Sequence, residues 1–486
     1  MSGLRRRLRN LPLGLLIFLV ACTVNPAGRS VFTGFMSPDQ EASIGAKEHP
    51  KVIQEFGGEY DDPNVRAYVS DIGKKIAAKS EMPNLKWTFT VLNSDVVNAF
   101  ALPGGYIYVT TGLMTIANSE AELGSVLGHE IGHVTAHHTA ERYSSTVLAQ
   151  LGFGFLNMAT GGIGQDLLSS GATALLAGFS QDQEAEADTL GVRYIARAGY
   201  DPNAMSSMFK NMELDSRLTD LLAGRSNGDQ YSLFATHPRT ASRIAASAAE
   251  ARRQVPPSEA LRVGEGDYLA MLDGLTYGGD ANNGFVRDTV FVHPKLRFRF
   301  EVPRGFQIFN SPDQVVAMGP SNARVMFDVG TKNTNVSLDR YLSDVWASNV
   351  PLRNMERITV NGMEGAAATT RVNASGTALD VKLVAIRPSP QLVYRFIFIS
   401  MANQTASMSE GFRRTTYSFR VLSVAEAARE EPYRIRLHPV GANETVETIA
   451  KRMPFKDYQV ERFRALNGLS VGQKLQPGRL VKIVDG

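Results

Sequence analysis

The sequence predicts an α+β multidomain chain: a mainly helical first part with a small sheet, an α+β sandwich-like part, and a small βααβ tail. Apolar residues recur at helical spacing after Ser119 and again after Gln183. Alternating or β-branched runs dominate residues 296–400, and residues 434–484 predict strand, helix, helix and strand. With 486 residues, 43% hydrophobic and 20% charged, the composition indicates an ordinary globular protein of about three domains.

The first helix carries the most informative motif. Ser119 and Glu122 form a capping-box pattern, and no proline follows until well beyond Arg142, which predicts one helix through this region. Inside it lies His129-Glu130-Ile131-Gly132-His133. Two imidazoles four residues apart share one helix face and can bind one metal ion, with Glu130 beside it as a general base. The alternative is a buried helix with two structural histidines.

A catalytic zinc ion needs a third protein ligand. His137 lies roughly 6 Å further along the helix axis than His133, so its side chain is badly placed to bind the same ion. A better candidate is Glu184 in the second helix, where Asp188 shares its face and can accept the second ring N–H of a ligand histidine. We expect Glu186 to point elsewhere, into solvent. The alternative for Glu184 and Asp188 is an ordinary acidic first helical turn, stabilised by the helix dipole.

Together these motifs resemble the two halves of the zinc signature of the M48 metallopeptidases, a gluzincin group. The likeness covers roughly residues 25–255 and includes two further ordered stretches, Asn98 to Val109 and Thr236-His237-Pro238 with Arg243-Ile244. It implies a mainly helical gluzincin-type peptidase domain over residues 22–255. It also implies one Zn²⁺ per chain, bound by His129, His133 and Glu184, with Glu130 as the base and Asp188 orienting a ligand histidine.

Two other stretches have roles that the resemblance implies. Residues 106–111 predict a strand, which in similar peptidases is the edge to which an extended substrate adds; the alternative is a plain core strand. His237 precedes a proline and therefore lies in an extended segment. In relatives such a histidine can occupy the open zinc position as a latch, and the alternative is a structural loop histidine. Arg243 could pair with an acidic residue or polarise the reacting carbonyl, and both roles stay open.

The N-terminus predicts export and lipid anchoring. Residues 1–21 form a basic stretch followed by an apolar run from Leu11 to Ala21, which is typical of a signal peptide and too short to span a bilayer. The run ends in Leu19-Val20-Ala21-Cys22, which resembles the bacterial lipobox and holds the chain's only cysteine. We expect a lipid on Cys22 to anchor the protein in the membrane. Because Thr23 replaces an inner-membrane retention aspartate, the periplasmic face of the outer membrane is the expected location.

The charge balance and the cysteine content give no support for a nucleic-acid-binding protein or for a protein stabilised by disulfides. The net charge of +3 includes four arginines of the leader, and without residues 1–21 the chain has 47 basic and 48 acidic residues. This balance gives no indication of a nucleic-acid partner. A single cysteine also excludes a disulfide framework.

Between the two zinc motifs, residues 143–181 contain one charged residue, Asp166, and are rich in Gly, Ala and Leu. Gln150, Asn157 and the glycine-rich break at 161–164 leave no apolar run long enough to span a membrane. We expect one or two buried or membrane-surface helices that could form a lid over the active site.

The remaining chain predicts three segments. Residues 256–285 form a linker with a short helix near 268–275, after the helix-breaking stretch at 252–257. Residues 286–425 form an α+β domain faintly like PsbP, with strands at 296–302, 314–318, 325–329, 356–360, 366–371, 379–386 and 392–400 and helices near 337–347 and 408–414. Residues 430–486 resemble a LysM module, whose members often bind peptidoglycan glycans; a spacer or protein-docking role is the alternative.

These observations favour an exported lipoprotein zinc endopeptidase. Its expected substrates are misfolded, stalled or misassembled envelope proteins, and its expected partners are the membrane, through lipidated Cys22, and peptidoglycan, through the LysM-like module. The alternative from another class is a binding or chaperone-like lipoprotein with a latent metal site, tethered to peptidoglycan. Peptidoglycan hydrolysis by the same zinc is a weaker alternative.

Overall fold

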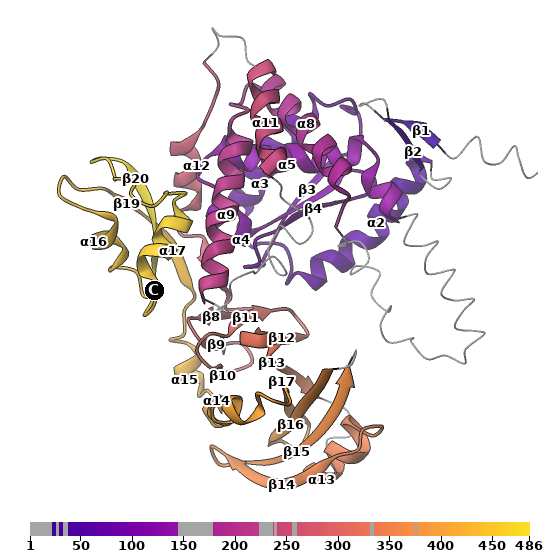
Figure 1. Ribbon diagram of the computed structural model, residues 1–486, viewed down its shortest axis with the longest axis vertical. Coiled ribbons are helices and arrows are strands. Elements are labelled where there is room, and N and C mark those ends of the chain that lie inside the picture. The colour runs from indigo at the N-terminus through magenta and orange to yellow at the C-terminus, as the bar shows by residue number, and fades with distance from the viewer. Residues whose placement is uncertain are drawn as a thin grey trace, which may run out of the picture.

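The computed structural model describes residues 22–25, 29–32, 37–143, 178–222, 237, 241–254, 260–330, 335–374 and 377–486. The expected signal peptide and nearly all of the expected lid, residues 144–177, lie outside these ranges. The described chain is an α+β structure in which a mainly helical first part, a strand-rich middle part and a small tail occupy separate regions of Figure 1. None of the helices within these ranges is long and apolar enough to cross a bilayer.

The first part packs helices around a three-stranded sheet. The strands are β3 (Thr88–Leu92), β4 (Ala99–Leu102) and β5 (Tyr106–Thr110), in the order β3-β5-β4, with β3 parallel and β4 antiparallel to β5. The helices are α2 (Pro38–Glu55), α3 (Pro63–Ala77), α4 (Thr111–Ile116), α5 (Glu120–Thr135), α8 (Gln181–Arg197), α9 (Ala204–Leu222) and α11 (Ala241–Gln254). The expectation that the strand near 106–111 forms the edge is wrong, because β5 is the central strand and β4 is an outer one.

Helix α5 begins where its cap predicts and ends earlier than expected. The Ser119 side chain accepts a hydrogen bond from the Glu122 backbone N–H, which is the predicted N-terminal cap. The predicted continuation to Arg142 in one helix is wrong, because α5 ends at Thr135 and His137 adopts a left-handed backbone with φ of 59°. A helical segment resumes at His138. This kink gives the side chain of His138 a direction that helical spacing does not predict.

Helices α5 and α8 approach closely because glycines line their contact. A Cβ atom on Gly132 would lie 2.9 Å from the Ala187 carbonyl oxygen, and one on Gly191 would lie 2.8 Å from the His129 backbone nitrogen. Neither position accepts a larger residue without moving a helix. The close contact brings the histidines of α5 opposite the acidic first turns of α8.

The middle part consists of two antiparallel sheets. The order is β18-β10-β9-β8-β7 in one sheet and β11-β12-β13-β17-β16-β15-β14 in the other. The strands are β7 (Gly279–Asp280), β8 (Gly284–Arg287), β9 (Val290–His293), β10 (Phe298–Glu301), β11 (Gln307–Asn310), β12 (Gln314–Met318), β13 (Arg324–Gly330), β14 (Arg353–Val360), β15 (Met363–Ala374), β16 (Thr377–Ser389), β17 (Leu392–Met401) and β18 (Arg420–Val421). Each predicted strand overlaps an observed one. Helix α14 (Thr405–Ser418) covers the position predicted near 408–414, and the segment predicted near 337–347 is the short α13 (Leu338–Arg340) followed by a π-helical turn, Tyr341–Trp346.

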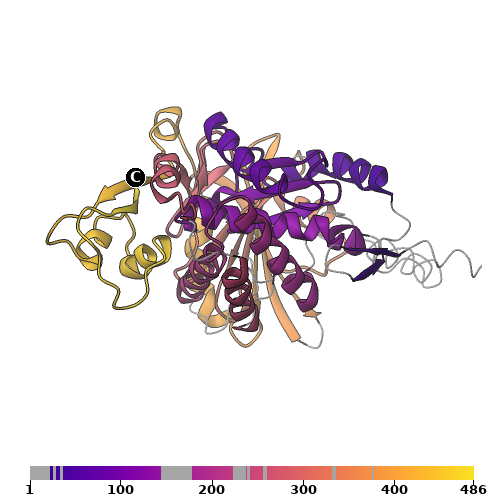
Figure 2. The ribbon, with the colours of Figure 1, turned by 90° about the horizontal axis from the view of Figure 1, so that it is seen from above.

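The tail has the predicted strand, helix, helix and strand order: β19 (Tyr433–Pro439), α16 (Val446–Ala450), α17 (Gln459–Leu466) and β20 (Leu480–Asp485). Strand β19 also pairs with β6 (Thr276–Tyr277), which follows α12 (Glu265–Leu272). Buried tail residues such as Ile449 and Phe463 belong to the same hydrophobic core as Leu127 of the motif helix. The tail is therefore packed against the helical first part, at the end of the molecule opposite β1 (Cys22–Val24) and β2 (Ser30–Phe32) (Figure 2).

Candidate metal centre

Two histidines of α5 and one glutamate of α8 converge in the interior. The Nε2 atoms of His129 and His133 lie 3.0 Å apart. The Glu184 carboxylate lies 3.5 Å from His129 Nε2 and 3.4 Å from His133 Nε2. All three side chains are buried. The structure therefore brings together the three side chains that the sequence suggested as ligands.

His237 joins this group from a distant part of the chain. Its Nδ1 lies 2.8 Å from Glu184 Oε1 and 3.2 Å from His129 Nε2. One donor atom from each of His129, His133, Glu184 and His237 lies within 4.8 Å of the other three. Three imidazole nitrogens and one carboxylate oxygen are a donor set suited to a transition-metal ion such as zinc.

Glu130 lies beside the group with unused hydrogen-bonding capacity. One of its carboxylate oxygens, Oε2, is buried and has no hydrogen-bond partner among the described residues. The other, Oε1, is 3.6 Å from His237 Nε2. Burial raises the pKa of Glu130 above its ordinary value. A buried carboxylate of this kind needs a ligand or water to satisfy it, so these residues fit a metal site.

Asp188 and Arg243 surround the ligands on one side. Asp188 Oδ1 lies 2.9 Å from His129 Nδ1, the ring nitrogen that faces away from the group. Arg243 contacts two carboxylates: its Nε is 2.7 Å from Asp188 Oδ2, and its Nη1 is 2.7 Å from Glu184 Oε2. Of the two roles left open for Arg243, the structure shows the ion pair. Fixing Asp188 in this way orients His129 and selects its tautomer.

Three contacts on the other side were not foreseen. His138 Nδ1 lies 3.0 Å from His133 Nδ1, and its Nε2 lies 3.2 Å from Glu186 Oε2. Phe179 stacks on the His133 ring with centroids 3.8 Å apart. The expectation that Glu186 is solvated is therefore wrong. As expected, His137 is not in the group, and its Nδ1 instead lies 3.2 Å from Glu41.

A cavity of about 30 Å³ adjoins the candidate metal-ligating group, which is made of His129, His133, Glu184 and His237. It is lined by Ser125, Val126, His129, Glu130, Asp188, Met205, Met208, Phe209, Met212, His237 and Arg243. A volume of this size admits a water molecule and is too small for a peptide side chain. This cavity alone therefore does not hold a peptide side chain.

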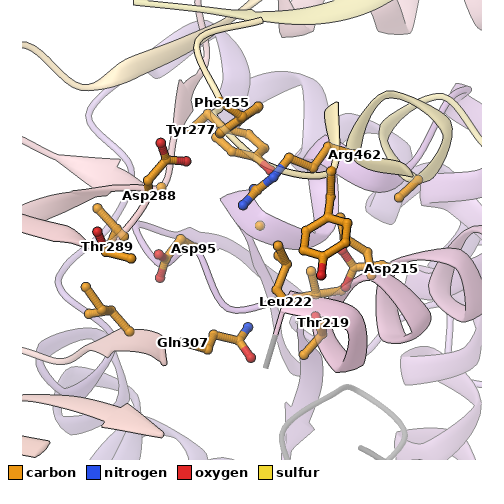
Figure 3. Close-up of a pocket in the computed structure, with 18 of the residues that line it drawn as sticks. Asp95, Asp215, Thr219, Leu222, Tyr277, Asp288, Thr289, Gln307, Phe455 and Arg462 are labelled. Carbon is orange, nitrogen blue, oxygen red and sulfur yellow. The ribbon is translucent and has the colours of Figure 1, made fainter. Parts of the chain in front are cut away.

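A second cavity of about 770 Å³ lies where the three parts of the chain meet (Figure 3). Asp95 and Asp215 of the peptidase part face it, and burial raises the pKa of each to about 6. Arg462 of the tail reaches it and lies over the Phe455 ring at 4.2 Å. None of the metal-ligating residues lines this cavity, so it is separate from the metal centre.

Paired histidines on one helix, a glutamate on the next and a buried carboxylate beside them are the arrangement expected of a metal centre in a metal-dependent hydrolase. Residues 63–251 match the model of peptidase family M48, and this part of the chain belongs to that family.

Similar proteins are named as metalloendopeptidases or proteases. The mitochondrial metalloendopeptidase OMA1 of Schizosaccharomyces pombe is 31% identical over 43% of this chain and 60% of that protein. The beta-barrel assembly-enhancing proteases of Yersinia pestis and of Escherichia coli K12 are 30% and 28% identical, over 46% and 47% of this chain and the same shares of those proteins. The chain thus spans less than two thirds of each of these relatives.

The solution structure of the cyanobacterial PsbP of Synechocystis is similar at 12% identity, over 27% of this chain and 91% of that chain, with a TM-score of 0.21. This likeness is too low to support the PsbP resemblance, which stays a prediction.

Proposed function

We propose that the protein is a zinc-dependent endopeptidase, exported and anchored by a lipid on Cys22, that hydrolyses unfolded or misassembled envelope proteins at the periplasmic face of the outer membrane. The observation that carries the proposal is the buried group of His129, His133 and Glu184, with a Glu130 oxygen beside it that has no hydrogen-bond partner among the described residues. Relatives named beta-barrel assembly-enhancing protease support the envelope as the place of action.

In this mechanism Glu130 moves the proton. The chemistry that a bound zinc ion supplies is Lewis acidity, which lowers the pKa of a water and polarises a peptide carbonyl. Glu130 removes a proton from the attacking water and later delivers it to the leaving amine. The raised pKa that burial gives Glu130 suits a group that must both accept and return a proton. Asp188 keeps the proton of His129 on Nδ1, so that Nε2 is free to bind metal.

His237 acts as a latch in this proposal. Its imidazole lies among the three proposed ligands and would bind a metal held there in place of the water that catalysis needs. The small size of the adjoining cavity supports a latent state. His237→Ala should therefore cleave β-casein faster than the wild type. Equal or slower cleavage, with metal still bound, would exclude the latch.

Substrate would bind in extended form along β4. Within the described residues β4 pairs only with β5, which makes its other edge the proposed place for backbone hydrogen bonds to a peptide, although β4 is buried in this structure. Strand β4 also contacts the motif helix α5, which places this edge near the metal ligands. Unfolded proteins supply such extended segments, whereas folded ones do not.

Chelation tests the metal dependence of the whole protein. The full chain in detergent should cleave β-casein, stop when a strong zinc chelator is added, and resume when zinc is restored. Cleavage that survives complete metal removal would contradict the proposal.

The tail supports a second candidate function, a peptidoglycan-tethered binding lipoprotein whose metal site stays latent. Its strand, helix, helix and strand order supports the LysM resemblance, and His237 within the ligand group favours latency. Sedimentation of the full chain with insoluble peptidoglycan, competed by N-acetylglucosamine oligomers, tests the tether. A chain that sediments, binds zinc and cleaves nothing even as His237→Ala would favour this second function.

A further inference from the structure

The segment that follows Cys22 contacts the far side of the metal centre. Strands β1 and β2 pair with each other and lie at one flank of the peptidase helices (Figure 1). Asn25 is 4% exposed, and its side-chain amide donates a hydrogen bond to Glu186 of α8. Arg29 Nε donates to the other Glu186 oxygen at 3.0 Å, and its Nη2 reaches Glu141 at 3.3 Å. Two side chains of the N-terminal segment thus fix one carboxylate.

That carboxylate is connected to a metal ligand through one imidazole. Glu186 Oε2 lies 3.2 Å from His138 Nε2, and His138 Nδ1 lies 3.0 Å from His133 Nδ1. Both histidine rings are fully buried. No residue of this connection except His133 belongs to the metal-ligating group.

One assignment of protons satisfies every atom of this connection. His133 Nε2 faces the other ligands and must be free of a proton to bind metal, so its proton lies on Nδ1. His133 Nδ1–H then donates to His138 Nδ1, which places the proton of neutral His138 on Nε2. His138 Nε2–H then donates a hydrogen bond to Glu186, whose carboxylate also accepts hydrogen bonds from Asn25 and Arg29.

The two metal-ligating histidines of α5 are therefore oriented differently. His129 donates directly to Asp188, which Arg243 fixes within the peptidase core. His133 donates to His138, which in turn donates to Glu186. The Glu186 carboxylate is fixed by Asn25 and Arg29, which lie about 100 or more positions before His133 in the chain. Outer partners of this kind set the ring orientation and basicity of metal ligands.

We propose that His138 is a positioning residue for His133, and that Asn25 and Arg29 make the N-terminal segment part of the metal centre. This inference rests on the proposed metal site. Because coupling between two binding events is reciprocal, metal binding and docking of the segment strengthen each other. Asn25 is three residues from Cys22, a span of about 10 Å of extended chain, so the expected anchoring point and the metal centre are mechanically connected.

The test measures zinc affinity of the full chain in detergent, by competition with a chromogenic chelator, and the visible spectrum of the Co²⁺ form. His138→Gln retains a donor toward Glu186 and removes the acceptor for His133, whereas His138→Asn retains an acceptor near the Nδ1 position. We expect His138→Gln to weaken zinc binding about 10- to 100-fold and to change the Co²⁺ spectrum, and His138→Asn to restore most of the affinity.

Arg29→Ala tests the N-terminal segment without altering the ligand helix. It should weaken zinc binding and speed zinc release, with partial rescue in Arg29→Lys. Arg197→Ala is the matched control, because Arg197 forms an exposed 3.3 Å ion pair with Glu81 near the end of the same helix α8. Hydrogen exchange across residues 22–32 should slow on zinc addition in the wild type and in Arg197→Ala, and not in His138→Gln.

Zinc affinities of His138→Gln and Arg29→Ala equal to that of Arg197→Ala would overturn the proposal. If His138→Gln does not fold, the Arg29 variants decide alone. Because the readouts are metal affinity and hydrogen exchange, a chain that binds zinc and cleaves nothing, even as His237→Ala, would contradict the proposed function and leave this inference intact.

Discussion

The tail and the middle part both follow the peptidase helices in sequence, yet they relate to those helices in opposite ways. The tail shares one hydrophobic core with the motif helix, and Lys482 of β20 donates hydrogen bonds into the peptidase part, to the carbonyls of Thr115 and Ala117, the latter at 2.6 Å. The middle part has cores of its own, rich in phenylalanine and built around Phe327, Phe396 and Phe398. The tail therefore shares its core with the peptidase helices, whereas the middle part packs around cores of its own, and we expect the middle part to unfold separately.

The largest loss of unfolding free energy should come from replacing one buried phenylalanine in each core by alanine. Phe463→Ala removes a fully buried ring from the shared core and should cost about 3–5 kcal/mol of unfolding free energy in the peptidase part. Phe396→Ala should cost a similar amount in the middle part alone. The two tryptophans report separately, because Trp87 packs on the shared core and Trp346 on the middle part.

Single-tryptophan variants make this comparison measurable. With Trp346→Phe, denaturant unfolding follows Trp87 and should shift for Phe463→Ala only. With Trp87→Phe, it follows Trp346 and should shift for Phe396→Ala only. A Phe463→Ala effect confined to tail-specific probes would show that the tail is an independent module.

Metal removal should lower the stability of the peptidase part and not that of the middle part. A ligand that binds only the folded state stabilises it, by about 2.7 kcal/mol when the free ligand is ~100 times its Kd. Adding a strong chelator should therefore lower the midpoint of the Trp87 transition and leave the Trp346 transition in place. A shift in both transitions would mean that the middle part unfolds together with the metal centre.

A smaller, pH-dependent effect is expected at Lys482. Burial lowers the pKa of this amine to about 7, with Glu122 the charged group that acts against the shift. Above pH 7 the folded chain releases a proton that the unfolded chain keeps, so raising the pH from 7 to 9 favours folding. Lys482→Met removes this pH dependence of stability. It also leaves two buried carbonyls unpaired, which should cost about 1–3 kcal/mol of unfolding free energy.

In thermal unfolding followed by Trp87, the stability difference between wild type and Lys482→Met should grow between pH 7 and pH 9. A difference that stays constant or shrinks would exclude the lowered pKa.

Local signals predicted much of this fold. The capping pair Ser119 and Glu122 placed the start of α5, and the predicted strand 314–318 has the bounds of β12, because both depend on neighbouring residues. The order β3-β5-β4 was not predictable in this way. Strand pairing depends on contacts between distant segments, so the hydrophobic pattern within one strand does not predict its partner.

The same division applies to the metal centre. Helical spacing was enough to suggest His129, His133 and the Glu184–Asp188 pair. It could not suggest His138, because the left-handed His137 breaks the helical phase without a glycine or proline to mark it. Nor could it suggest Arg29, which meets Glu186 across 157 residues of sequence.

Zinc content and β-casein cleavage of Glu130→Gln, measured beside the wild type, test directly whether Glu130 is the base of a zinc peptidase. The substitution preserves shape and leaves every candidate ligand in place. We predict about one zinc per chain in both proteins and loss of turnover by a factor of at least ~10²–10⁴ in the variant. Zinc-loaded Glu130→Gln that still cleaves at a rate near that of the wild type would contradict the assignment of Glu130 as the base and, with it, the proposed mechanism.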